Sequence, residues 1–411
     1  MKSILGIFIF QMTALVGFAQ ELTKEAWMED LAAYKSGLEE KHIDVYNKIN
    51  RADFESELEK IKAAIGEKTD FETVIDLMRL TRKIGDGHTA VSTRNLDIHN
   101  YPLELQKFDG NWRVVGVSEK YKHLLGMELI EIDGKQIQLV AEKVSEVAQF
   151  VENEYSQVVR TAQYLTNAEL LHGLGITSQN MLAVFTFQDD NGKRIREELR
   201  PLSREDYDKT AFSKIEIGVP EISAPENPTI ENFWYAPIVE TSGLYIHFES
   251  YPKFEEMMTV AEEMVGYIYQ QNIQKLVIDL RNNGGGDLYV GLVLANALNV
   301  ADPVDWKSGV YVLCDNVTFS AATSNTALFR ELLNAKIVGE ATGSNPSGYQ
   351  DMDTFELPNS KLVICYSKRL FRIQETVSSG VQPDVPLKYE WESFSRGNDN
   401  MLEWVIRDMK K

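Results

Sequence analysis

The sequence has 411 residues, and at about 150 residues per domain this length allows two to three domains. Hydrophobic residues make up 44% and charged residues 25%, as in soluble globular proteins, which excludes wholesale disorder and fibrous folds. The 42 Lys and Arg residues are outnumbered by 62 Asp and Glu residues, and the net charge is −20. Such a surface repels phosphate backbones and anionic lipids, so we expect no nucleic-acid partner.

The first 20 residues predict a secretion signal that is not part of the fold. Lys2 gives a basic start, and an apolar stretch begins at Ile4. Gly17 and Ala19 then place small residues before a cleavage site; the alternative is an amphipathic or core helix. No later apolar run approaches the roughly 18 residues of a membrane helix. We therefore expect an exported protein, periplasmic or extracellular, without stable membrane insertion.

Apolar spacing and turn residues divide the rest of the chain. Helical spacing from residue 22 to 84 predicts a small helical domain. Strand patterns with Asp-Gly turns then enclose a helical stretch at 139–172, and a proline-bearing segment follows. Strands alternate with helices after Ser242, which predicts an α/β fold with much parallel pairing. The predicted units are a signal peptide at 1–20, a helical domain at 21–98, a β-domain at 99–203, a linker at 204–236 and an α/β core at 237–411.

Cysteine and histidine content gives little support for a metal or a disulfide framework. The six His and two Cys residues are too few and too scattered for a zinc ribbon, and nothing requires a metal or organic cofactor. Cys314 and Cys365 lie in apolar runs that predict buried strands. We favour two unpaired thiols over a bridge between them.

A glycine-rich turn is the first candidate for chemistry. Gly284, Gly285 and Gly286 follow a buried strand and precede a helix, where exposed backbone N–H groups can bind a developing oxyanion. Neither G-x-G-x-x-G nor the Walker Lys-Ser/Thr pair is present, which argues against phosphate binding. The alternative is a tight turn with Asp287 as the N-cap of the helix.

Ser320 is the second candidate. It lies at the predicted start of a helix among small residues, where a hydroxyl is accessible and close to the positive end of the helix dipole. An ordinary N-cap role for Ser320 or Thr318 is the alternative. The sequence has no G-x-S-x-G elbow, so an α/β-hydrolase is not indicated.

His88 is the third candidate, because its position beside Gly87 places it on a loop from which it can point into a cleft. A solvated loop histidine is the alternative. The other histidines lack neighbours with catalytic or metal-ligand spacing, and we predict structural or surface roles for His42, His99, His123, His172 and His247.

Taken together, these motifs resemble peptidase family S41, which includes tail-specific and tricorn-type proteases. An Asp-Gly-His-Thr loop, Asp-Leu-Arg-Asn-Asn-Gly-Gly-Gly, a Ser-Ala-Ala helix start and Gly-Val-Gln-Pro-Asp-Val occur in the family's order within residues 25–390. The resemblance implies a ClpP/crotonase-like catalytic core, an N-terminal helical domain and a PDZ-like β-domain. It also implies a serine endopeptidase that cleaves peptides or unfolded proteins through an acyl-enzyme, without a cofactor.

The resemblance also implies roles for individual residues. Ser320 matches the nucleophile, and the backbone N–H groups of Ala321 and of the 284–286 glycines match the oxyanion hole. Tail-specific enzymes place a Lys where this sequence has Asn345 or a neighbour, and an amide cannot accept the hydroxyl proton. In the tricorn-like branch the base is a His, which His88 matches.

The carboxylate of that branch matches Glu375, although Ser378 or Ser379 remain alternatives for orienting the histidine. Two other functions stay open. One is a catalytically silent protein that holds peptides or apolar ligands on the same fold, and the other is a Ser-Lys hydrolase with Lys336 or Lys368 as base. Whether the PDZ-like domain binds C-termini or gates the cleft, and which oligomeric state the chain adopts, do not follow from the sequence.

Overall fold

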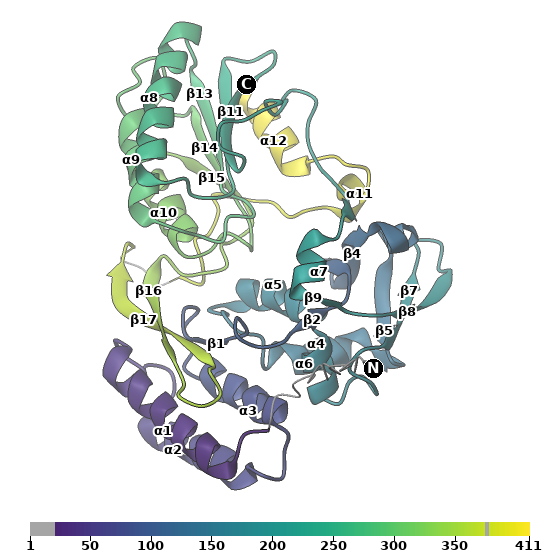
Figure 1. Ribbon diagram of the computed structural model, residues 1–411. Helices are drawn as coiled ribbons and strands as arrows, with labels where there is room; N and C mark the ends of the chain where they lie inside the picture. Colours follow the sequence, from purple (N-terminus) through teal and green to yellow (C-terminus); the bar gives the residue numbers. More distant parts are fainter. Residues whose placement is uncertain (1–20, 375–377) are drawn as a thin grey trace, which may run out of the picture.

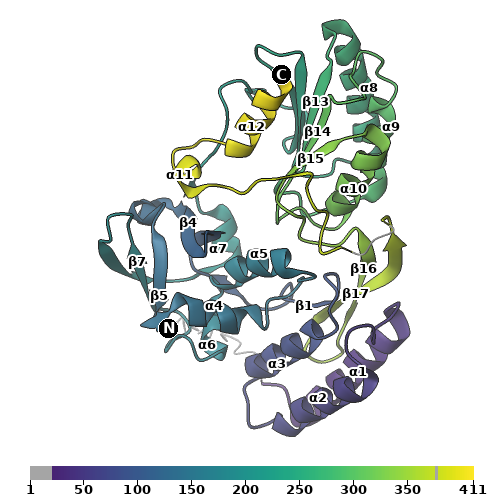
Figure 2. The same ribbon diagram turned by 180° about the vertical axis from the view of Figure 1, so that it is seen from behind.

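The computed structural model describes residues 21–374 and 378–411, so the predicted signal peptide and Glu375 lie outside the described residues. Figures 1 and 2 show three parts, which are a group of N-terminal helices, a middle β-domain and a larger α/β region. In the described part of the chain, no helix combines the length and apolar character needed to cross a bilayer.

The N-terminal helices are α1 (Lys24–Lys41), α2 (Arg51–Ala64) and α3 (Asp70–Arg82). They follow the predicted apolar spacing, and α3 begins with a capping box between Thr69 and Glu72. Their buried side chains belong to one core that continues into the middle β-domain.

The middle β-domain is an antiparallel sheet in the order β10-β4-β5-β7-β8, with β3 on β4 and β6 on β5. Asp109 and Gly110 both have positive φ, as the predicted two-residue hairpin turn between β3 and β4 requires. The helical stretch forms three short helices beside the sheet. The bounds are β2 (His99–Asn100), β3 (Leu103–Phe108), β4 (Asn111–Ser118), η1 (Glu119–Leu124), β5 (Glu128–Ile132), β6 (Lys135–Gln136), α4 (Ile137–Ser145), α5 (Glu154–Tyr164), α6 (Ala168–Gly173), β7 (Ala183–Gln188), β8 (Arg194–Leu199) and β9 (Leu202–Ser203).

The segment predicted as a linker, 204–236, contains regular structure. It includes α7 (Arg204–Lys209), β10 (Phe212–Lys214) and the first residues of β11 (Phe233–Ile238). β10 pairs antiparallel with β4, so this part of the segment belongs to the β-domain. The elements are short and polar, and they give no periodic signal that would compete with the prolines that follow.

The α/β region contains a six-stranded sheet in the order β11-β12-β13-β14-β15-β18, in which only the β11 pairing is antiparallel. Helices α8, α9 and α10 cover one face, and α12 packs on the other (Figure 1). The bounds are β12 (Gly243–Phe248), α8 (Phe254–Gln271), β13 (Lys275–Asp279), α9 (Leu288–Leu298), β14 (Val310–Cys314), α10 (Ala321–Leu333), β15 (Lys336–Gly339), β18 (Val385–Pro386), α11 (Trp391–Phe394) and α12 (Asn400–Met409).

A long hairpin connects the α/β region to the N-terminal helices. It consists of β16 (Ser347–Glu356) and β17 (Val363–Arg372), and β17 pairs antiparallel with β1 (Ala90–Ser92). A Cβ on Gly37 of α1 would lie 2.5 Å from the Phe355 ring, which shows how closely the helix packs on the hairpin. Because β1 follows the 85–89 loop directly, the hairpin holds that loop beside the α/β region.

Both cysteines are buried and unpaired, as favoured from the sequence. Cys314 is the last residue of β14. Cys365 lies in β17, opposite Ala90 of the neighbouring strand β1.

Candidate active site

Ser320 occupies the N-cap position of α10, but its side chain makes no capping hydrogen bond. Its backbone has φ 52° and ψ −123°, a conformation that costs a non-glycine residue about 1–3 kcal/mol and is concentrated at functional sites. The Ser320 N–H donates to Ser344 Oγ at 2.7 Å, and Ser344 Oγ in turn lies 2.9 Å from Thr323 Oγ1. The hydroxyl of Ser320 is therefore left for another partner.

That partner is His88, which lies 232 positions earlier in the chain and has its Nε2 2.9 Å from Ser320 Oγ. The imidazole is only 5% exposed. Burial lowers the pKa of His88 below its ordinary value of 6.5, and the nearby Asp86 carboxylate opposes this shift. At neutral pH the imidazole is therefore uncharged, which is the form that can accept a proton from the serine.

Asp86 anchors the loop that carries His88. Its Oδ1 accepts the His88 N–H and the Ser367 hydroxyl, both at 2.8 Å. Its Oδ2 accepts the Thr89 hydroxyl at 2.6 Å and lies 2.7 Å from His42 Nε2. Burial alone would raise the pKa of Asp86, but the hydrogen bonds from His42 and Thr89 outweigh it, and the pKa is lowered.

His42 thus helps to hold the loop that carries His88. The residues next to His42 in the sequence give no sign of this role. It is one of the five histidines predicted to be structural or surface, and it is buried against Asp86. The remaining four are bound elsewhere: His99 to Glu169, His123 to Glu197, His172 to the carbonyl of Thr177 and His247 to Glu249. Among the described residues, no cluster of three or more His, Cys, Asp or Glu side chains could hold a metal ion.

The glycine-rich turn lies directly against the serine. A Cβ on Gly285 would be 2.7 Å from Ser320 Cβ, and Gly285 has a φ of 101°. The Gly285 N–H donates to Asn283 Oδ1 at 2.9 Å. Of the predicted oxyanion donors, this leaves Ala321, Gly284 and Gly286 as the candidates. The capping alternative also holds, because Asp287 accepts the N–H of Tyr289.

Neither of the two lysines considered as a base is paired with Ser320 in the described part of the chain. Lys336 Nζ lies 2.8 Å from Asp408 of α12, and Lys368 lies near two aspartates of β16. Asn345 stands near the position where tail-specific enzymes have a lysine. Its Oδ1 accepts the Gly380 N–H at 2.8 Å. Its role is to hold the two loops together.

The third member of the predicted triad, Glu375, lies outside the described residues. Its two alternatives are engaged elsewhere. Ser378 Oγ donates to the Gly380 carbonyl at 2.7 Å, and Ser379 Oγ donates to Glu154 at 2.6 Å. In the described part of the chain, Nδ1 of His88 is buried and makes no hydrogen bond within 3.5 Å, although the backbone of Tyr349 lies close enough to raise the pKa of the imidazole.

A cleft of about 1700 Å³ separates the β-domain from the α/β region. One wall is formed by β3 and α5, and the opposite wall includes Asn316 and Val317 of the loop that precedes Ser320. Carboxylates outnumber basic side chains along it: Glu104, Asp109, Glu154, Glu216, Glu249, Asp315 and Glu340 line the cleft together with Lys107, Lys214 and Lys388.

Comparison with known families gives one match, over a short part of the chain. The family model described as peptidase family S41 matches residues 244–304, from β12 to beyond α9. No curated protein matches the chain. The segment matched by the family contains the glycine-rich turn.

Two solved structures of CPAF show the same fold over nearly the whole chain. Mature CPAF complexed with lactacystin has a TM-score of 0.62 and 14% sequence identity, over 94% of this chain and 98% of that chain. Mature CPAF alone has a TM-score of 0.63 and 14% identity, over 94% and 97%. The photosystem II D1 C-terminal processing protease has 13% identity over 89% and 94%, with a TM-score of 0.42.

Proposed function

We propose that this chain, a serine peptidase of family S41, is an exported endopeptidase that cleaves peptide bonds with Ser320 as nucleophile, His88 as base and Glu375 as the orienting carboxylate. The observation that carries the proposal is the 2.9 Å contact between His88 Nε2 and the hydroxyl of a strained serine. A protein that only binds peptides has no need of this pair.

In the proposed reaction, Ser320 Oγ attacks the peptide carbonyl while His88 Nε2 accepts its proton. His88 then donates this proton to the leaving amine, and an acyl-enzyme remains. Water, deprotonated by the same imidazole, attacks the acyl carbon and releases the acid product. Backbone N–H groups of Ala321 and the glycine-rich turn stabilise the oxyanion, each well-aimed donor contributing roughly 3 kcal/mol.

The imidazole needs a partner at Nδ1 that fixes its tautomer, and the backbone of Tyr349 lies near this ring. Its Nδ1 is buried without a partner in the described part of the chain, and the carboxylate of a serine triad bonds this atom to fix the tautomer. We assign the role to Glu375 because the resemblance to the tricorn-like branch of family S41 implies a Glu shortly before the Gly-Val-Gln-Pro-Asp-Val motif.

We assign a PDZ-like role to the middle β-domain. The cleft along β3 and α5 leads to the loop before Ser320, and an extended peptide can add to a free strand edge there by backbone hydrogen bonds. In this arrangement the domain delivers substrate to the catalytic core, which has a ClpP/crotonase-like architecture. The first 20 residues direct export to the periplasm or the medium.

The test is labelling with a fluorophosphonate probe, followed by mapping of the adduct by mass spectrometry. We expect an adduct on Ser320 that is lost in Ser320→Ala and His88→Ala and is reduced in Glu375→Gln. His99→Ala is the matched control, because it removes a histidine bound to Glu169 in the β-domain. A folded wild-type protein that stays unlabelled with candidate peptides present would instead support the silent binding protein.

A further inference from the structure

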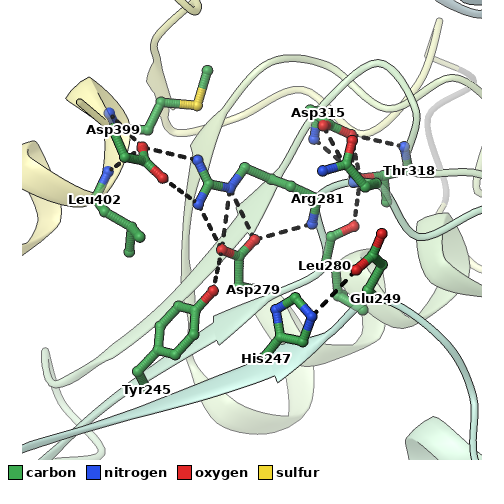
Figure 3. A network of polar contacts seen from close by, with 12 residues as sticks. Tyr245, His247, Glu249, Asp279, Leu280, Arg281, Asp315, Thr318, Asp399 and Leu402 are labelled. Carbon is green, nitrogen blue, oxygen red and sulfur yellow. Dashed lines mark hydrogen bonds and ion pairs between the residues drawn. The ribbon is translucent and has the colours of Figure 1, made fainter. Parts of the chain in front are cut away.

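Asp315 lies between the two loops that form the candidate active site, beside Leu280 and Thr318 (Figure 3). It is 2% exposed. Its Oδ1 accepts the N–H groups of Val317 and Thr318, both at 3.0 Å. The Asn282 N–H lies 3.2 Å from each of the two carboxylate oxygens. One side chain therefore binds both the loop that precedes Ser320 and the loop that leads to the glycine-rich turn.

Neighbouring residues reinforce this connection. Thr318 Oγ1 donates to the Leu280 carbonyl at 2.8 Å and accepts the N–H of Asp315 at 3.0 Å. The Phe319 N–H donates to the Asn283 carbonyl at 2.9 Å. The residues immediately before Ser320 are thus bound to the residues immediately before the glycines.

Both loops hold a non-glycine residue with positive φ, 61° at Asn282 and 52° at Ser320. A strained backbone persists only where the surroundings over-determine it. The Asp315 carboxylate supplies this constraint from a buried position, and it does so through backbone N–H donors instead of an ion pair.

Arg281 illustrates the difference. Its guanidinium forms ion pairs with Asp279 at 2.6 Å and with Asp399 at 2.7 Å, and Asp399 is the N-cap of α12 (Figure 3). Those two carboxylates attach the C-terminal helix to the sheet. Asp315 binds the backbone of the two active-site loops.

We propose that Asp315 is a positioning residue, which keeps the nucleophile loop and the oxyanion loop at a fixed separation so that the tetrahedral intermediate meets both. The inference rests on the proposed peptidase activity. Asp315 does not touch the reacting atoms, and it acts through Asn282, Val317 and Thr318.

The variant that tests this role is Asp315→Asn. The amide oxygen of the variant can still accept from Val317 and Thr318. Its amide nitrogen replaces the second carboxylate oxygen, and because an NH2 group is a donor it cannot accept the Asn282 N–H. The turn before Ser320 is then kept while the bridge to the oxyanion loop is weakened. A shift of about 1 Å in a reacting group costs on the order of 100-fold in rate.

We expect kcat per fluorophosphonate-titrated site to fall about 10- to 100-fold in Asp315→Asn, with KM changed less than about twofold. Asp399→Asn is the matched control, since Asp399 is also 2% exposed and belongs to the neighbouring Arg281 network. It should lower the melting temperature without changing kcat per titrated site.

Two results would overturn the proposal. An equal kcat per titrated site in wild type, Asp315→Asn and Asp399→Asn would show that Asp315 has a structural role alone. A wild-type protein with no label on Ser320 would instead remove the peptidase activity on which the inference depends. Because the first result requires a labelled wild type, the two failures are distinguishable.

Discussion

Ser320 and His88, the proposed nucleophile and base, are held in different ways, although their side chains meet at 2.9 Å. Ser320 is fixed by residues of its own α/β region, which bind its N–H and the loop before it. His88 is fixed by Asp86, whose partners include His42 after α1 and Ser367 of β17. The nucleophile is therefore organised within one region, whereas the base depends on how two regions dock.

The sharpest way to break this arrangement is His88→Ala. We expect loss of about 10,000-fold or more in kcat/KM, as for other serine triads that lose their base. The backbone of Ser320 should stay in place because none of its anchors involves His88. Peptide hydrolysis and an unchanged melting temperature would check this. A large loss of stability would contradict the view that the anchors of the Ser320 backbone do not depend on His88.

Gly285→Ala disturbs Ser320 from within the α/β region that holds it. A Cβ there would lie 2.7 Å from Ser320 Cβ and 2.8 Å from the Phe319 carbonyl, so we expect about a 100-fold lower labelling rate at Ser320. The control is Gly266→Ala in α8, because no atom lies within 4 Å of the Cβ it would add. Equal labelling rates for both variants would show that the turn tolerates displacement.

Asp86→Ala tests the docking of the base. The change leaves buried donors from His42, Thr89 and Ser367 without an acceptor, and we expect a loss of roughly 3 kcal/mol in the free energy of unfolding. Urea denaturation measures it, with Asp44→Ala as an exposed control. The pKa of Asp86 is lowered in the folded state. Its contribution to stability is therefore present above its unfolded pKa of about 3.9 and is lost as the pH falls through the folded value.

The pH profile is the mildest test. The pKa of His88 is lowered by burial, so the basic form persists to more acid pH than for an exposed histidine. We expect kcat/KM to rise with pH through a midpoint below the ordinary value of 6.5. A midpoint above that value in the wild type would contradict the burial argument.

The sequence predicts the residues that meet at this site better than it predicts the residues that hold them in place. Ser320, His88 and the glycines lie at turns between regular elements, where residue type and spacing give a local signal. The pairing of His42 with Asp86 spans 44 positions, and no local pattern records it. The Ser344 hydroxyl that accepts the Ser320 N–H is similarly distant.

The same contrast applies to the fold. Helical and strand periodicity predict the N-terminal helices and the alternating α/β region, because each buries a regular apolar face. The sequence predicts a buried strand around Cys365, at the start of β17, but not the β16–β17 hairpin. The second half of β17, from Ser367 to Arg372, carries charged and exposed side chains, and its pairing with β1 is a contact between distant parts of the chain.

That pairing has a consequence for how the candidate active site is assembled. Contacts between residues far apart in sequence form late, because loop closure must be paid for before they contribute. β1 gains its partner only when residues 363–365 of β17 are available. A growing or truncated chain that ends before β17 therefore lacks the strand that holds the His88 loop in place. Proteolytic competence would then arise as one of the last events of folding, after the whole polypeptide has been made.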